Sequence, residues 1–489
     1  MANNKLKREM GLLLVIATGI CSMMGASINV IPFMIQKNVP GIGSYVVPAF
    51  LFAAIPAIFA AYAYAILSSA MPRAGGSYLY ASRGLNPYLG FIASFSQWFG
   101  LSIVIGVISY IIVPFIRDVF FNLGFMNISD FLEVGSVRLI ISLFLIWLFV
   151  LINILGGKVY KNTLIPMLVI MFVLGSIVLI TGLVYDQNDF INSVLNSENR
   201  VIEPISDIKF DWKIFLTAAT LMFSSFIGFD AIAQTGNEAK NPTKNIPRAI
   251  LLAIFIVASY YILFTISVYN IVPWSFVADE SITKDITAPG LLSYVLPPFW
   301  GILIIIGAAI ALINDLPAMI LSVSRLMFAW AKDNIFPSRV ALIHSKFNTP
   351  YIAIILVGFV ASIGAIGSHF AGDFFLGIDI MVTSMMINFL LMCVTLISIQ
   401  RVNLKLFRNI TVIKNRAIQL FIGYTGTLII SVFLIIHTYK DLSSNVEEWY
   451  FHSTYIYLIV MTIASIYFAL RWKTVQVKNK NTFITLPVE

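Results

Sequence analysis

Residues 21–27 read CSMMGAS and lie in the middle of an apolar run that extends from residue 9 to residue 36. Residues 224–228, SSFIG, interrupt a second apolar run, 211–236, in the same way. Small and polar residues at such depth either let helices pack closely or mark a place where the backbone leaves the helix. Backbone outside a helix needs protein or a water-filled cavity to supply hydrogen-bond partners. Two interruptions therefore predict a polar site between apolar helices.

The composition of the whole chain indicates a membrane protein. Of its 489 residues 59% are apolar and 11% are charged, which nearly excludes a water-soluble enzyme. One crossing takes roughly 20 residues, so the apolar content corresponds to about a dozen helices. The apolar runs are continuous rather than alternating, which favours helices over a β-barrel. The twelve windows are 9–36, 44–71, 89–116, 138–155, 162–185, 211–236, 248–273, 294–328, 350–367, 374–399, 416–437 and 454–471.

The distribution of basic residues predicts the orientation. Counted from a cytoplasmic N-terminus, the inner segments hold 23 of the 31 Lys and Arg residues. The positive-inside rule then places the tails, 1–8 and 472–489, in the cytoplasm, and the chain as a multi-pass protein of the cytoplasmic (cell) membrane. The net charge of +8 is thus explained by the lipid bilayer, and no nucleic acid partner is expected. The longest polar stretch, 185–210, is too short for an independent core.

The positions of the two interruptions indicate an internal repeat. They fall in the first and sixth windows, which are the first members of two five-helix halves, 9–185 and 211–399. Because each half has an odd number of crossings, the second half starts from the opposite side of the membrane. Inverted-repeat transporters place their discontinuous helices at these positions. The remaining helices, 416–471, are an addition to this all-α fold of twelve spans.

A pair of broken helices suits a zwitterion. A break exposes free amides at the start of one helical piece and free carbonyls at the end of the other. The amides carry a partial positive charge and suit a carboxylate, whereas the carbonyls suit an ammonium group or Na⁺.

Four stretches resemble the amino acid, polyamine and organocation (APC) transporter superfamily, near its bacterial and archaeal amino acid permeases and its cationic amino acid transporter branch. Residues 24–32, MGASINVIP, are similar to the G-S-G-I-F-x-x-P of the first span, and residues 71–80, MPRAGGSYLY, to the P-x-A-G-G-x-Y-x-Y loop. Residues 226–242, from FIGFD to the NP pair, resemble the exit of span six. Residues 324–350, which begin with SR and end with TP, resemble the eighth span and the loop after it.

The resemblance implies a five-plus-five inverted repeat with discontinuous helices 1 and 6, the LeuT-like fold. It implies a substrate carboxylate on the amides of Gly25, Ala26 and Ser27 and an amino group on nearby carbonyls. Two residues depart from the family pattern. Ser27 replaces the usual Gly, and Ser224 stands where relatives place an aromatic residue that closes over the substrate. Either Phe223 or Phe226 is then the occluding aromatic, or the occluded state is built differently. The implied substrate-binding residues are Met23, Met24, Gly25, Ala26, Ser27, Phe223, Ser224, Ser225, Phe226 and Ile227.

Three carboxylates fall within the spans, where an ionisable residue indicates function. Asp230 also has a structural interpretation, as a cap of the break, and Asp379 lies near the end of its span. Asp315, preceded by Asn314, lies in the middle of span eight, and these two residues and Asp230 are the candidates for coupling or side-chain recognition. Burial disfavours the ionised form of a carboxylate and a cationic substrate favours it, so Asp315 is predicted to carry a coupling proton or to pair with a basic substrate group. The alternative is a satisfied polar residue beside a break at Pro317.

The predicted function is secondary-active amino acid transport by alternating access, with H⁺ as the expected coupling ion and Na⁺ as the alternative. A cationic or small neutral amino acid is the expected cargo. The alternatives are a carrier of polyamines or other organic amines, an amino acid/amine exchanger, and a channel or sensor on the same fold. The sequence contains no metal-ligand pair, nucleophile elbow or P-loop, so neither a cofactor nor an enzyme is expected. It leaves the oligomeric state open.

Overall fold

The computed structural model describes residues 6–25, 27–202, 208–284, 286–371, 374–444, 446, 448–478 and 483–487. Within these ranges the regular elements are helices, and one isolated β-bridge joins Met10 to Ala239. Eleven helical segments of the described chain are long and apolar enough to cross a membrane. The remaining predicted crossing, the first, consists of two shorter helices. The predicted all-α fold with twelve spans is thereby confirmed.

Ten crossings are single long helices, one of them extended by a short 3₁₀ turn. They are α3 (Val46–Ala70, preceded by η1, Gly43–Tyr45), α5 (Pro87–Asn122), α7 (Gly135–Ile154), α8 (Gly157–Val184), α12 (Pro242–Ile271), α15 (Pro298–Lys332), α16 (Tyr351–Ala371), α17 (Phe374–Val402), α19 (Arg416–Ser443) and α20 (Ser453–Lys478). Shorter helices connect them: α4 (Gly76–Gly84), α6 (Met126–Glu133), α9 (Gln187–Glu198), α13 (Trp274–Thr283), α14 (Ala288–Leu292), η3 (Ser338–Ala341), α18 (Leu404–Arg408) and η4 (Trp449–Phe451).

The two interrupted crossings are the ones that the sequence predicts. The first consists of α1 (Leu12–Cys21) and α2 (Ser27–Asn38), with residues 22–26 between them. The sixth consists of α10 (Trp212–Met222), the 3₁₀ turn η2 (Phe223–Phe226) and α11 (Ala231–Gln234). At 1.5 Å per residue neither α1 nor α2 can cross a membrane alone. The division into halves at 9–185 and 211–399 stays a prediction.

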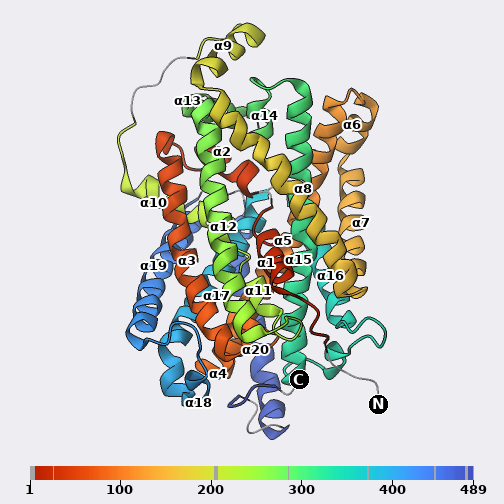
Figure 1. The fold of residues 1–489 in the computed structure, drawn as a ribbon, viewed down its shortest axis with the longest axis vertical. Coiled ribbons are helices and arrows are strands. Elements are labelled where there is room, and N and C mark those ends of the chain that lie inside the picture. The colour runs from red at the N-terminus through yellow and green to blue at the C-terminus, as the bar shows by residue number, and fades with distance from the viewer. Residues whose placement is uncertain are drawn as a thin grey trace.

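The helices are arranged in an inner and an outer set. The inner set, α3, α5, α10, α15 and α17, is mostly buried, whereas α7, α8, α16, α19 and α20 bury a third or so of their apolar windows. The outer helices expose large apolar side chains, such as Phe144, Leu183, Phe421 and Leu470. Figure 1 shows α1 in the middle of the bundle and α7 and α19 at opposite margins. An apolar outer surface of this kind faces lipid.

The bundle has two ends. In Figure 1, α4, α18 and the end of α20 lie at the lower end, which is called the terminal end below. The connecting helices α6, α9, α13 and α14 lie at the upper end, called the opposite end. The segment before α1 and the end of α20 both lie at the terminal end, as an even number of crossings requires.

Glycines bring α5 and α16 into backbone contact. A Cβ atom on Gly364 would lie 2.4 Å from the carbonyl oxygen of Ile103, and a Cβ atom on Gly106 would lie 2.1 Å from that of Ala361. By contrast, Gly367, one turn further along α16, has no such neighbour within 4 Å. Close backbone approach of this kind is how membrane helices gain van der Waals contact without a hydrophobic driving force.

This contact predicts different effects for two substitutions on one helix. Gly364→Ala forces α16 away from α5 and is expected to lower the free energy of unfolding by about 1–3 kcal/mol, the usual cost of overpacking. Gly367→Ala meets open space and is expected to leave the melting temperature unchanged or slightly raised, since Ala favours a helix over Gly. Thermal unfolding of both variants in one detergent checks this, and equal melting temperatures would contradict the packing.

Candidate functional site

A small cavity of about 40 Å³ lies between the two interrupted crossings. The break in the first crossing contributes Ser22, Met23 and Gly25, and the break in the sixth contributes Ser224 and Ile227. The other lining residues come from helices, and all of them are apolar except one carboxylate. These residues are Ile31 of α2, Val104, Val107 and Ile108 of α5, Asp315 and Met319 of α15, and Ile378 and Met381 of α17.

The two breaks are locked together by backbone contacts. Gly228 adopts a φ of 136°, and a Cβ atom there would lie 2.1 Å from the carbonyl oxygen of Ser22. The hydroxyl of Tyr261 donates to the carbonyl oxygen of Met23 at 2.6 Å. Glycine is needed at position 228 both for its φ and for this close approach. The Met23 carbonyl, which the resemblance offers to a substrate amino group, already accepts this hydrogen bond and a second one from the Gly25 amide at 3.2 Å.

Asp315 reaches into the first break. Its side chain is buried, and its Oδ2 atom lies 2.4 Å from the position that a Cβ atom on Gly25 would take. Its Oδ1 atom has no hydrogen-bond partner in the described part of the chain. The neighbouring Asn314 donates to Sγ of Cys21 at 2.9 Å. A buried polar atom without a partner is costly, so it indicates a place for a ligand or a proton.

The helix around Asp315 differs from the sequence expectation. The expected break at Pro317 does not occur, because α15 continues from Pro298 to Lys332. Proline lacks an amide hydrogen, and one turn of an otherwise continuous helix can tolerate that loss. With Oδ1 left without a partner among the described residues, the interpretation of Asp315 as a satisfied residue beside a break is not supported.

Both carboxylate oxygens of Asp230, in contrast, accept hydrogen bonds from the protein. Its Oδ1 atom accepts the amide of Gly228 at 3.1 Å, and its Oδ2 atom accepts a short hydrogen bond from Gln97. Gln97 in turn accepts from Ser77 at 2.5 Å and from Gln234 at 3.3 Å. Asp230 is not among the residues that line the cavity. The carboxylate therefore caps the sixth break, and a role in coupling stays a prediction.

Several predicted site residues lie elsewhere. Phe223 packs on Phe389 and Phe433, and Phe226 packs on Phe50 and Tyr261. Neither phenylalanine lines the cavity, and neither does Ser225, so no aromatic of η2 closes over it in this conformation. Ala26 lies outside the described residues, and for Ser27 only the backbone, at the start of α2, is described.

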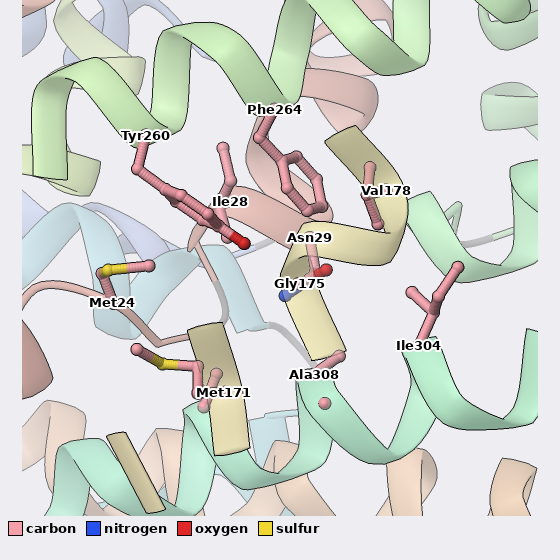
Figure 2. Close-up of a pocket in the computed structure, with 12 residues that line it drawn as sticks. Met24, Ile28, Asn29, Met171, Gly175, Val178, Tyr260, Phe264, Ile304 and Ala308 are labelled. Carbon is pink, nitrogen blue, oxygen red and sulfur yellow. The ribbon is translucent and has the colours of Figure 1, made fainter. Parts of the chain in front are cut away.

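Met24 lines a second, smaller cavity of about 20 Å³ between α2, α8, α12 and α15. Figure 2 shows the hydroxyl of Tyr260 and the side-chain amide of Asn29 pointing into this mostly apolar space, with Met171 beside Met24. The first break thus has Met23 and Gly25 on the Asp315 side and Met24 on the other.

Three segments of the chain are joined on the terminal side of the Asp315 cavity. The Met10 amide donates to the Glu238 carbonyl at 3.0 Å, and the Lys240 amide donates to the Met10 carbonyl at 2.8 Å. The guanidinium of Arg325 grips the Glu238 carboxylate through two hydrogen bonds of 2.7 and 3.1 Å, with the Arg325 side chain only 2% exposed. These contacts, called the terminal clamp below, join the segment before α1 to the exit of the sixth crossing and to α15.

The apolar lining is the part of the site that the sequence does not reveal. Val104, Val107 and Ile108 share one face of α5, and Ile378 and Met381 share one face of α17. Both helices are apolar on every side, so hydropathy alone does not tell which face points inward. Residues three or four apart lie on the same face of a helix. The lining residues of each helix could therefore be found only after one of them is known to face inward.

A family model described as "Amino acid permease" matches residues 10–465. The chain belongs to the amino acid permease family. This confirms the resemblance to the APC superfamily, and it points to a transporter rather than an enzyme.

Among curated relatives of this permease, an uncharacterized transporter of Mycobacterium tuberculosis is 33% identical over 148 residues, 30% of this chain and 32% of the relative. Branched-chain amino acid permease BcaP of Bacillus subtilis is 28% identical over 150 residues, 30% of this chain and 31% of the relative. Cationic amino acid transporter 9, chloroplastic, of Arabidopsis thaliana is 29% identical over 209 residues, 39% of this chain and 35% of the relative. These matches span about a third of the relatives' own lengths.

The contact between Gly25 and Asp315 predicts a sensitive position in the permease. A methyl group in Gly25→Ala meets Oδ2 of Asp315 and is expected to lower amino acid uptake at least about tenfold by displacing the carboxylate. Gly11→Ala is the matched control, since nothing lies within 4 Å of its Cβ position. Uptake normalised to the amount of folded protein checks the prediction, and normal uptake by Gly25→Ala would contradict it.

The terminal clamp predicts a shift in conformation. Glu238→Gln removes the charge that compensates the buried Arg325, a loss of up to about 3–5 kcal/mol, and is expected to open the terminal end. The thiol of Cys21, buried at the end of α1, should then react faster with a maleimide supplied from that end, in a background in which Cys393 is replaced by Ala.

Glu133→Gln is the control for the clamp experiment. Its carboxylate pairs with Arg117 on the surface and is 59% exposed, where an ion pair contributes little. Labelling of Cys21 at the parental rate in Glu238→Gln would mean that the clamp does not hold the terminal end closed.

Proposed function

We propose that this permease is a secondary-active amino acid transporter of the cytoplasmic membrane, with both tails in the cytoplasm, that works by alternating access and is coupled to protons. The observation that carries the proposal is the buried carboxylate of Asp315, which lies against Gly25 where the two broken helices meet and whose Oδ1 atom has no hydrogen-bond partner among the described residues. The terminal end of the bundle is then the cytoplasmic end, in line with the distribution of Lys and Arg.

The helix ends around the cavity suit the two charged groups of an amino acid. α2 begins at Ser27, beside Gly25, and its first amides point back toward the break. α1 ends at Cys21 and α10 ends at Met222, so the carbonyls of their last turns point toward the same region. A carboxylate on the amides and an ammonium group on the carbonyls would use both kinds of end.

Asp315 supplies the coupling in this proposal. Its carboxylate and the carboxylate of a bound amino acid would share the region beside Gly25 and the start of α2. Two like charges about 4 Å apart repel by roughly 4 kcal/mol at an effective dielectric constant of about 20. Protonation of Asp315 removes this repulsion, so the proton and the substrate favour each other's binding, and by linkage the effect is reciprocal.

The names of the relatives support amino acids as the cargo. One relative is named a branched-chain amino acid permease and another a cationic amino acid transporter. The matched segments cover only part of each chain, so the relatives support the class of substrate rather than one amino acid.

Alternating access requires the terminal clamp to break. The cavity lies between the breaks. On its terminal side, the contacts of Met10, Glu238 and Arg325 hold three segments of the chain together. Release to the cytoplasm in this proposal separates the segment before α1 from the exit of the sixth crossing, in the manner of a gate.

A carrier of organic amines is the second candidate, and the same carboxylate favours it. An amine without a carboxylate would bring no negative charge to the amides at the start of α2. Asp315 could then stay ionised beside them and pair with the amine. The two candidates predict opposite pH dependence. Amino acid affinity should rise as the pH falls, because protonated Asp315 is required, whereas amine affinity should rise with pH.

Asp315→Asn separates these candidates because Asn imitates the protonated form. Amino acid binding by the variant should become independent of pH, uphill uptake driven by an imposed pH gradient should be lost, and expression should be preserved. Amine binding would instead be abolished. Binding and uptake in proteoliposomes between pH 5 and pH 8 check this.

The control for this experiment is Asp379→Asn. Asp379 lies on α17, 4.0 Å from Nζ of Lys440, and is not part of the cavity lining. It should keep the pH dependence of the parent. If Asp315→Asn still accumulates the amino acid when a pH gradient is imposed, the proposed coupling is contradicted.

A further inference from the structure

The lining of the Asp315 cavity has a polar part and an apolar part, which are called its polar and apolar ends below. The polar end is formed by the two breaks and holds Ser22, Gly25, Ser224 and Asp315. The apolar end is a wall of side chains from α5, α15 and α17, of which Val104, Ile108 and Met381 are representative. Asp315 is the one charged side chain among the described residues that line the cavity, and its Oδ2 atom lies against Gly25, at the polar end.

The wall is rigidly built. A Cβ atom on Gly377 would lie 2.5 Å from a methyl group of Val107, and a Cβ atom on Gly100 would lie 3.1 Å from the Cα atom of Met381. These two glycines therefore let α17 approach α5 on both sides of the wall. Val107, Ile378 and Met381 are all buried or nearly so, and well-packed aliphatic side chains of this kind do not rearrange at low cost.

The wall has nothing to offer a charged or strongly polar group. A lysine or arginine side chain placed against the wall would lose its hydration, and the wall itself contains no carboxylate to pair with it. Burying an ionised group without a partner is costly enough to exclude it. A glutamate side chain would meet the same obstacle. An aliphatic side chain would gain by leaving water and by contact with the wall.

We infer that the cavity selects neutral amino acids with an aliphatic side chain, such as leucine, isoleucine, valine and methionine, and that Val104, Ile108 and Met381 determine this specificity. The inference rests on the proposed function, since it assigns the polar end to the amino acid's α-carboxylate and α-amino groups. It leaves Asp315 for the proton and removes it from side-chain recognition.

A panel of labelled amino acids in proteoliposomes tests the inference. Leucine, isoleucine, valine and methionine should compete with one another, and alanine should compete at least about tenfold less well, the usual order of effect for missing methylene groups in an apolar pocket. Lysine, arginine and glutamate should not compete. Uptake of lysine or arginine in preference to leucine would overturn the inference and leave the proposed function intact. Failure to transport any amino acid of the panel would overturn the proposed function itself.

Substitutions in the wall test the named residues. Met381→Ala enlarges the apolar end and should raise the ratio of phenylalanine uptake to leucine uptake about tenfold, and Ile108→Ala should act in the same direction. Met392→Ala is the control, because Met392 is buried on the same helix but does not line the cavity.

The ratio of two substrates is insensitive to the amount of folded protein, which removes the effect of a less stable variant. An unchanged ratio in Met381→Ala and in Ile108→Ala, or an equal change in Met392→Ala, would contradict the assignment of specificity to the wall.

Discussion

The structure depends on one constraint, which is that backbone polar groups within apolar surroundings need partners. Two crossings leave the helical conformation in the middle of the bundle, where the breaks pack closely on each other and neighbouring side chains hydrogen-bond to their backbone. Gly228 approaches the Ser22 carbonyl, Tyr261 donates to the Met23 carbonyl, and Asp230 accepts the Gly228 amide. Backbone free of a helix at this depth is tolerated only in such surroundings. The same freedom lets the helix ends serve a ligand.

The breaks, the carboxylate and the closure of the bundle are physically connected. Asp315 touches the first break, and ten residues further along the same helix Arg325 grips Glu238 beyond the sixth break. α15 runs without interruption between these two points. A movement of α15 relative to α1 that follows a change in the charge of Asp315 would therefore also act on the terminal clamp. This connection makes α15 the element through which a proton would influence the gate.

The sequence predicts the architecture of this protein better than its site. The small-residue clusters at 21–27 and 224–228 coincide with the gaps after α1 and around η2, because a broken helix needs unusual residues. Asp315 could be singled out because charge is rare in an apolar span. The apolar wall could not be predicted, since a valine that faces a cavity and one that faces lipid look alike in an apolar helix. Nor could the orientations of Phe223 and Phe226 be predicted, because a 3₁₀ turn sets them. The break expected beside Pro317 is absent, since α15 continues through this proline.

The central claim is that Asp315 carries a proton with the amino acid. The most direct measurement is the internal pH of proteoliposomes, reported by an enclosed pH-sensitive dye, when leucine is added outside without an imposed pH gradient. Proton-coupled uptake should acidify the inside of the vesicles as leucine enters, and this acidification should be absent in Asp315→Asn. Leucine uptake at the full rate with no change in internal pH would contradict it.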